Sequence, residues 1–382
     1  MYRNTFVKID KEILKANVHN ITENYSEYKY FFGVVKGNAY GHGLEVIDSL
    51  IEGGVNYLAV ATPDEAISVR EKNKDIPILC LEPVSASAFA PLCKSNITFT
   101  VDSLDNATAL SKFADNSKVK VHIKLDTGMN RLGFKDKREL SEALELLKSN
   151  HNIYLEGIYT HLATSGVNDI YYDRQLKKFE ELTQDIDLAS IPIVHIGRSL
   201  ILVHHKKPNF VNGVRLGICM YGFSQSLPEP TGLRKIKRDL LLKRKGISQS
   251  ILSNDLKLRT AFSLYSEVIS VKNIKKGEFV GYSAGFIANE DMTVATLSIG
   301  YFDGMNKNLG FVVINGQRCE ILGEICMDMT AVKVPHTVKC GDIAEIFGYT
   351  VSISEAAKNM GVNAYKVFTS IGHRVPRIYD KD

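Results

Sequence analysis

The chain has 382 residues, of which 45% are hydrophobic and 24% are charged, and its net charge is +4. These values are typical of a globular protein long enough for two domains, or for one large barrel with an additional part. The small net charge does not indicate nucleic-acid binding. The six cysteines form no CxxC pair, so we predict neither a metal site nor a disulfide framework, and we expect a reducing compartment.

The opening residues, MYRNTFVKIDKEILKANV, contain no apolar stretch of the kind found in secretory signal peptides. No part of the chain approaches the ~18 consecutive apolar residues that a membrane span requires. We therefore expect a cytoplasmic protein that does not associate with a membrane.

Between residues 29 and 218, short apolar runs alternate with longer segments that carry charges on one side. The segment 62–74 is a predicted helix, with Thr62 as its N-cap and a proline at its first helical position. Further helices are predicted at 136–150 and 173–184. The apolar runs are hydrophobic throughout, which predicts strands covered on both faces, as in a parallel sheet. The eight predicted strands are 29–35, 57–62, 76–82, 97–101, 118–125, 155–161, 191–197 and 212–218.

Eight strands with intervening helices in roughly 220 residues match a (β/α)8 barrel of the TIM type in number and length. We assign this barrel to residues 10–230. The pattern alone leaves a doubly wound open sheet as an alternative.

The chain changes character after the predicted barrel. Residues 231–257 form a predicted linker with a basic segment at 233–246, which could bind an acidic partner but more simply forms a solvated surface. From Leu258 onward the apolar runs are short and closely spaced, and Asn315-Gly316 between two of them is a strong hairpin signal. With one helix predicted in SISEAAKNMG, the part up to residue 382 is predicted to be a mainly antiparallel β domain.

Side chains that carry chemistry collect where the predicted barrel strands end, which is where the active site of such a barrel forms. Each of them alone could serve a structural role, but five strands end in this way. These residues are Lys36, Lys124, Asp126, Arg131, His161, His195, Ser199 and Arg215.

Lys36 ends the first predicted strand. A lysine at such a point can lose solvation and lie near other cations, and both effects lower its pKa and make the amine a nucleophile. The chemistry that most needs such an amine is Schiff-base formation, including that with pyridoxal 5′-phosphate (PLP). The backbone N–H groups of Gly217 and Ile218 and the Ser199 hydroxyl could hold a phosphate, because loops after the seventh and eighth strands commonly do so.

The segment VVKGNAYGHG (34–43) closely resembles the PLP-attachment motif of alanine racemases, which usually has Ala where this chain has Gly37. The resemblance continues in order through KLDTGMNRLGF, GIYTHLAT, GVRLGICMYG, VGYSAGF, SIGYFDG, ICMD and HRVPRIY. It implies an N-terminal PLP-binding barrel and a C-terminal β domain that includes residues 1–9. It also implies a homodimer in which each active site is completed by the partner's C-terminal domain.

The resemblance implies two catalytic bases. Lys36 would hold PLP and act as one base, and Tyr282 of the other subunit would act as the second, on the opposite face of the substrate. Because tyrosine normally has a pKa of ~10, nearby cations must assist it, and Arg131 matches the residue that does so. Lys124 matches a position that is often carbamylated in the family, which would give an anion able to orient Arg131.

Arg215 matches the residue that faces the PLP pyridine nitrogen. An arginine cannot give up a proton there, so the ring stays unprotonated and is a weaker electron sink, which limits side reactions. His161 and His195 would orient their neighbours, and His195 is expected to bond Arg215. The remaining matched positions are Tyr40 and Ser199, with Gly217 and Ile218, at the phosphate, and Tyr301 and Met327 at the substrate access and carboxylate side.

Three positions depart from the family pattern. Arg198 replaces the usual Asn, Glu324 replaces the usual Arg, and His373 replaces a Tyr that lies near both the phosphate and the substrate methyl group. His373 could widen the pocket so that serine or other amino acids are accepted, or it could be a neutral exchange in an enzyme that still prefers alanine.

Two further functions remain open at this point. A PLP-dependent decarboxylase of the same architecture would use a cysteine acid in the β domain, for which Cys326 is a candidate, although ICMD beside GYSAG fits the racemase pattern better. A PLP carrier without turnover is a third possibility, against which Tyr282 and Arg131 argue.

Overall fold

The computed structural model describes residues 3–115, 117–164, 170–223, 232–244 and 256–380. The chain divides into two compact units. The barrel unit comprises Leu14–Ala39 and Leu44–Leu258, and the β unit comprises Met1–Ile13, Tyr40–Gly43 and Arg259–Asp382.

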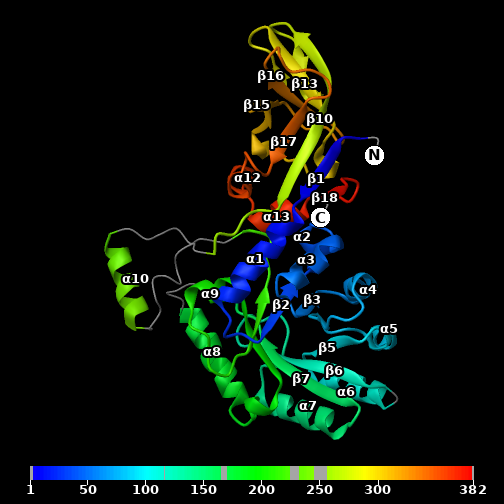
Figure 1. Ribbon diagram of the computed structural model, residues 1–382, viewed down its shortest axis with the longest axis vertical. Helices are drawn as coiled ribbons and strands as arrows, with labels where there is room; N and C mark the ends of the chain where they lie inside the picture. The colour runs from blue at the N-terminus through cyan, green and yellow to red at the C-terminus, as the bar shows by residue number, and fades with distance from the viewer. Residues whose placement is uncertain (1–2, 116, 165–169, 224–231, 245–255, 381–382) are drawn as a thin grey trace. The chain divides into compact units, whose positions relative to one another are not determined.

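The barrel unit contains a closed barrel of eight strands, in which neighbouring strands run parallel (Figure 1). The first and last strands close it, with Phe32 of one opposite Arg215 of the other. The predicted barrel is thus confirmed, and the open-sheet alternative is wrong. The strands are β2 Tyr30–Val34, β3 Tyr57–Val60, β4 Ile78–Cys80, β5 Ile97–Val101, β6 Val119–Leu125, β7 Ile153–Thr160, β8 Ile193–Arg198 and β9 Gly213–Leu216.

Helices follow the barrel strands and lie outside them (Figure 1). In α4 (Pro63–Lys72) the Thr62 side chain accepts the Glu65 N–H, so the predicted cap is confirmed. Helix α7 (Lys137–Ser149) begins after a comparable cap, Asp136, and buries one leucine-rich stripe. Helix α1 (Lys11–Asn24) precedes the first barrel strand. The other helices that follow barrel strands are α3 Ile47–Glu52, α5 Phe89–Lys94, α6 Leu104–Ala114, α8 Ile170–Thr183 and α9 Ser199–His204.

The β unit is built on an eight-stranded sheet in the order β13-β16-β15-β14-β17-β10-β1-β18. Strand β1 (Thr5–Ile9), from the start of the chain, pairs antiparallel with β10 and parallel with β18, while the other pairings are antiparallel. The predicted hairpin is present, because Asn315 and Gly316 join β14 to β15 with φ of 50° and 77°.

The predicted C-terminal helix is also present. The remaining elements of the β unit are β10 Phe262–Ile274, β11 Phe279–Val280, β12 Phe286–Ile287, β13 Met292–Leu297, β14 Phe311–Ile314, β15 Gln317–Leu322, β16 Thr330–Val334, β17 Ile343–Phe347, β18 Arg377–Tyr379, α12 Ile353–Met360 and α13 Ala364–Thr369.

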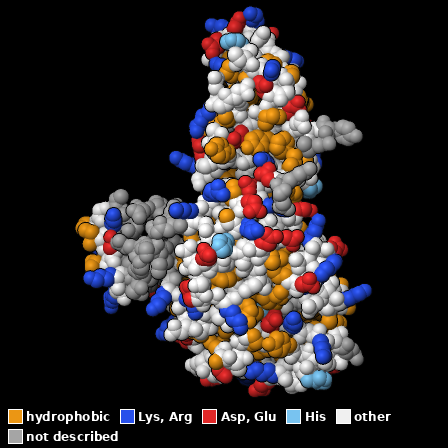
Figure 2. Space-filling model, in the orientation of Figure 1, with side chains coloured by type: hydrophobic (Ala, Val, Ile, Leu, Met, Phe, Trp, Pro, Cys, Tyr) orange, Lys and Arg blue, Asp and Glu red, His pale blue; other side chains and the backbone are white. Residues whose placement is uncertain are grey.

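The predicted basic segment contains helix α10 (Leu233–Arg244). Leu233, Ile236 and Leu240 are exposed on it, and Figure 2 shows hydrophobic and basic side chains next to one another along this helix. Neighbouring residues 224–231 and 245–255 lie outside the described residues. Within the described part of the chain, no helix combines the length and apolar character needed to cross a bilayer.

Candidate active site

Lys36 lies two residues after the end of β2, and the backbone after it is left-handed. Gly37, Asn38 and Ala39 have φ of 62°, 54° and 53°. A non-glycine residue in this conformation costs about 1–2 kcal/mol, and such strain is concentrated at functional sites. The Glu65 carboxylate holds the turn by accepting the N–H groups of Gly37 at 2.7 Å and Ala61 at 2.8 Å. The chain is thus turned sharply at the residue that was predicted to react.

The Lys36 side chain is exposed, contrary to the expectation that burial would activate it. Its ammonium group makes no hydrogen bond or ion pair with the described residues. The geometry of the turn, rather than desolvation, distinguishes this lysine from other surface lysines of the chain.

Arg215 in β9 is buried, with 3% of its surface exposed. Its Nη1 donates to Nδ1 of His195 at 2.6 Å and to the His195 carbonyl at 3.4 Å. Its Nη2 donates to the Thr160 carbonyl at 2.7 Å and to Nδ1 of His161 at 3.2 Å. The predicted contact between His195 and Arg215 is therefore present, and His161 belongs to the same group.

An arginine has five N–H donors, and the four on the two Nη atoms of Arg215 face acceptors. Among the described residues, Nε–H is the one donor of this side chain without an acceptor. The pyridine nitrogen of PLP is a single acceptor, so the donor set of Arg215 fits an unprotonated pyridine ring.

Lys124 lies at the end of β6 and is 5% exposed. Its ammonium lies 5.6 Å from the centre of the Tyr159 ring, and the guanidinium of Arg215 lies 5.1 Å from the same ring. Burial, and then the charges of Arg215 and Arg131, lower the pKa of Lys124 to about 8. A substantial fraction of neutral amine is therefore present in mildly alkaline solution.

Asp126 organises the loop that carries Arg131. Its carboxylate accepts the N–H groups of Gly128 and Asn130, both at 2.9 Å. Gly133 lets the loop return to the strand, because a Cβ there would lie 2.7 Å from the Asp126 backbone nitrogen, and its φ is 118°. Arg131 therefore lies on a structured loop, and its side chain is exposed.

The predicted phosphate site is partly preorganised within the barrel unit. The Ser199 Oγ accepts the Gly217 N–H at 3.0 Å and the Cys219 S–H at 2.9 Å. Because both contacts are donated to the oxygen, the hydroxyl proton of Ser199 remains available to donate to an anion. These residues therefore fit a phosphate group, with Ile218 next to Gly217 in the chain.

The predicted site residues of the β unit are exposed. Tyr282 begins the short turn Tyr282–Ala284, in which Ser283 and Ala284 have φ of 55° and 48°. Tyr282 is 69% exposed, Tyr301 is 55% exposed and Met327 is 50% exposed. Each of these three side chains is therefore largely open to solvent in the single chain.

Close backbone packing joins the segments that carry Tyr301 and Met327. The Tyr301 N–H donates to the Cys326 carbonyl at 3.0 Å, and the Phe302 N–H donates to the Met327 carbonyl at 3.1 Å. A Cβ on Gly300 would lie 2.3 Å from the Met327 carbonyl oxygen, so only glycine permits this approach.

Glu324 forms an ion pair with Lys307, so its charge is compensated within the β unit. His373 is exposed, between Gly372, whose N–H donates to the Asp303 carbonyl, and Arg374, which bonds the Asp303 carboxylate. The Arg198 side chain lies outside the described part of the structure.

Tyr40 is buried in the β unit against Tyr365, at 5.8 Å between ring centres. It shares the left-handed conformation of its neighbours, with φ of 53°.

Sequence reasoning did not single out several polar residues of the barrel interior. Thr160 supplies a carbonyl to Arg215, and His122 and Glu156 extend the hydrogen bonding beyond His195. A signal was present for His122, because it precedes Lys124 by two residues in the same strand and so lies on the same face.

Comparison with known proteins follows the same division of the chain. Residues 9–225 match the model of the alanine racemase N-terminal domain, and residues 261–379 match that of the alanine racemase C-terminal domain. The chain is 34% identical to the alanine racemase of Halalkalibacterium halodurans, over 100% of this chain and 96% of that protein.

Two solved structures have the same fold over nearly their whole length. The alanine racemase of Bacillus anthracis with bound L-Ala-P has a TM-score of 0.86 and 31% identity, covering 100% of this chain and 96% of that one. The alanine racemase of E. faecalis has a TM-score of 0.87 and 30% identity, and the match covers 100% of this chain and 99% of that one. On the matched domains, the full-length relatives and the shared fold, this chain belongs to the alanine racemase family.

Proposed function

We propose that the protein is a PLP-dependent racemase that interconverts L- and D-alanine, with Lys36 and Tyr282 as its two bases. The observation that carries the proposal is Arg215, buried at the end of a barrel strand with one N–H donor free for a ring nitrogen. Membership of the alanine racemase family supports it.

Several residues of the chain would hold the cofactor. Lys36 would form the covalent link, Ser199 with the adjacent Gly217 would bind the phosphate, and Arg215 would donate Nε–H to the ring nitrogen. PLP, when bound, supplies the electron withdrawal that acidifies the α-hydrogen of an amino acid. Because Arg215 donates a hydrogen bond without transferring its proton, this withdrawal stays moderate.

Inversion requires two bases on opposite faces of the α-carbon. The Lys36 Nζ would accept the α-proton from one face, and the Tyr282 oxygen would deliver a proton to the other, with the roles exchanged in the reverse direction. Arg131 would lie beside the phenolic oxygen and favour its anionic form. Lys124 would orient Arg131 after carbamylation of its neutral amine, for which its lowered pKa is favourable.

We further propose that the active enzyme is a homodimer. Tyr282, Tyr301 and Met327 each expose half or more of their surface, and a second copy of the chain would bury them. In this arrangement Tyr282 of one copy serves Lys36 of the other. Sedimentation of the full chain should give a dimer, and a monomer with full activity would contradict the arrangement.

The test of the function is direct. The chain with added PLP is incubated with L-alanine, and D-alanine is measured by chiral chromatography. Borohydride reduction followed by peptide mass spectrometry should place the pyridoxyl group on Lys36. Lys36→Ala should abolish both signals, whereas Lys29→Ala, at the opposite end of the same strand, should leave them unchanged. Release of CO2 would indicate a decarboxylase, and cofactor binding without turnover of any amino acid would indicate a carrier.

Serine is a second candidate substrate, and the observation that favours it is His373 at a position where the family pattern has Tyr. Histidine is smaller than tyrosine and can bond a hydroxyl group. The ratio of kcat/KM for L-Ala and L-Ser should be measured in the wild type and in His373→Tyr. A ratio that shifts toward alanine in the variant supports a wider pocket, and an unchanged ratio excludes that role for His373.

A further inference from the structure

Four side chains form a continuous hydrogen-bonded column through the barrel interior. Arg215 Nη1 lies 2.6 Å from His195 Nδ1, His195 Nε2 lies 2.9 Å from His122 Nδ1, and His122 Nε2 lies 3.2 Å from Glu156 Oε2. Both histidines are completely buried. The column starts at Arg215, within the candidate site, and ends at a carboxylate that no assigned function uses.

The column can carry its protons in one direction only. Arg215 only donates, so His195 Nδ1 must be the acceptor, and the proton of neutral His195 is on Nε2. That proton can only go to His122 Nδ1, which places the His122 proton on Nε2, facing Glu156. Reversing either imidazole would bring two donors face to face.

Packing holds both rings in this arrangement. The His195 ring is stacked between Tyr159, at 4.6 Å and 13°, and Phe32, at 4.5 Å and 12°. The His122 ring lies against Gly157, where a Cβ would come within 2.6 Å of ring atoms Cε1 and Nδ1. The rings are thus positioned by shape as well as by hydrogen bonds.

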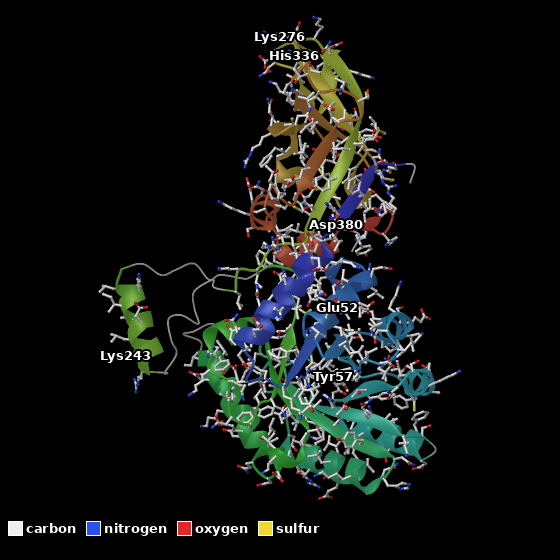
Figure 3. The ribbon with its side chains drawn as sticks, in the orientation of Figure 1. Glu52, Tyr57, Lys243, Lys276, His336 and Asp380 are labelled. Carbon is white, nitrogen blue, oxygen red and sulfur yellow. The ribbon has the colours of Figure 1, made fainter. Side chains whose placement is uncertain are left out.

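Glu156 is the terminal acceptor of the column. Its Oε2 also accepts the Tyr57 hydroxyl at 2.7 Å and the Thr98 hydroxyl at 3.3 Å, and Figure 3 shows Tyr57 among the barrel strands. Burial raises the pKa of Glu156, but the hydrogen bonds from His122 and Tyr57 and the nearby charge of Lys120 lower it overall. Glu156 is therefore a carboxylate at neutral pH.

The neutral state of the imidazoles has a separate cause. Burial, and then the Arg215 charge, lower the pKa of His195 well below its usual value. Burial also lowers the pKa of His122 overall, although the hydrogen bond to Glu156 and the charge of that carboxylate raise it. The column is therefore a buried cation and a partly buried anion joined by two neutral, aligned imidazole dipoles.

We propose that His122 and Glu156 are positioning residues for Arg215, which they hold through His195 so that its Nε–H alone is directed at the cofactor ring nitrogen. This inference rests on the proposed function. It assigns a role in cofactor recognition to a carboxylate that lies three hydrogen bonds away from the guanidinium.

The first test locates the imidazole protons of the two histidines directly by NMR. Long-range 1H–15N spectra of the full chain labelled with 15N-histidine distinguish the two neutral tautomers, and the signals are assigned with His122→Phe and His195→Phe. We expect both histidines to be neutral with the proton on Nε2 from pH 6 to pH 9. An Nδ1–H tautomer or an imidazolium at either position would overturn the proposal.

The second test uses a PLP analogue with a carbon atom in place of the ring nitrogen. Loss of one oriented hydrogen bond corresponds to roughly tenfold in affinity. Glu156→Leu and Gly157→Ala should therefore weaken PLP binding about tenfold and analogue binding less than about twofold. Glu156→Gln, which keeps an acceptor for His122, should rescue most of the loss.

Thr98→Val is the matched control, because it removes a contact to the same carboxylate outside the column. It should change the binding of neither cofactor by more than about twofold. If Glu156→Leu weakens PLP and analogue equally, the column serves only stability and the proposal fails. If the wild type binds PLP but racemises no amino acid, the proposed function fails, while the spectra and the binding comparison still decide the role of the column.

Discussion

In the barrel unit, Arg215 and Lys124 are buried, and four of the five N–H groups of Arg215 already have acceptors. In the β unit, Tyr282, Tyr301 and Met327 each expose half or more of their surface. Buried polar groups of the barrel unit thus find their partners within one chain, whereas these three side chains of the β unit are largely exposed. The difference teaches that the barrel unit holds these two cations at fixed positions within a single chain, whereas the single chain leaves the three side chains of the β unit largely uncovered.

The strongest test of this contrast is Tyr282→Phe. Removing one hydroxyl from an exposed side chain should leave folding unchanged but lower kcat for alanine racemisation by roughly 10²- to 10⁴-fold, because a base or acid on one face is lost. The measurement is D-alanine formation together with a thermal unfolding curve. Tyr349→Phe, on a tyrosine that is 94% exposed in the same unit, is the control. Retention of a third or more of the activity would show that Tyr282 is not a base.

The β unit also has a buried charge, and it is structural. The Asp303 carboxylate is bonded by Arg3, by Arg374 and by the Gly300 N–H. Asp303→Asn should cost about 3–5 kcal/mol in the free energy of unfolding, because two cations lose their buried anion. Asp328→Asn, an exposed partner of the same Arg374, should cost no more than about 1 kcal/mol. Equal losses of unfolding free energy in the two variants would show that the burial of Asp303 does not determine how much this network stabilises the protein.

The pH dependence of the same network has a definite sign. Burial raises the pKa of Asp303, but its arginine partners lower it overall to about 2. Its stabilising effect is therefore complete above the ordinary pKa of ~3.9 and is lost as the pH falls toward 2. The free energies of unfolding of the wild type and of Asp303→Asn, measured in urea between pH 6 and pH 2, should converge as the pH falls. A difference between the two proteins that stays constant with pH would contradict this assignment.

Lys124→Met tests the buried cations of the barrel. The pKa of Lys124 is about 8, so its charge costs stability at neutral pH, and stability is gained as the pH rises from 8 toward ~10. In CO2-free buffer at pH 7 the variant should be more stable by about 3 kcal/mol, and the difference should vanish near pH 10.5. Lys148→Met, on the exposed side of α7, is the control and should change the free energy of unfolding little at either pH. A difference that does not depend on pH would refute this explanation.

The smallest effect is expected at Glu324. Its pair with Lys307 is about half exposed on both sides, so Glu324→Gln should change the free energy of unfolding by less than about 1 kcal/mol. Glu290→Gln, which removes an exposed pair with Lys333, is the control and should change the free energy of unfolding by a similarly small amount. A clearly larger loss at Glu324 would mean that this part of the β unit depends on its surface charges.

Much of the fold was predictable because its signals are local. Continuous apolar runs predicted each barrel strand to within a few residues, and Thr62 and Asn315-Gly316 act as the cap and the hairpin turn that their side chains favour. The predicted start of the third helix, residue 173, was late, since α8 begins at Ile170, where exposed Ile170 and Tyr171 gave no helical stripe.

The candidate site was predictable as residue types at strand ends, but not as a network. Nothing in the spacing of Glu156 and His122 reveals that they meet, because their contact depends on the stagger between neighbouring strands. The exposure of Lys36 was also contrary to expectation, since burial depends on what covers the barrel end and not on the neighbours of Lys36 in the chain.

The sequence by itself determined the β/α alternation, the hairpin and the set of reactive side chains, because each depends on residues close together along the chain. Only the tertiary structure decided which donors of Arg215 are satisfied, which tautomers the two histidines must adopt, and that the start of the chain pairs with β10 and β18. These features arise from contacts between distant segments, where direction and burial are set by the closed barrel and the sheet as a whole.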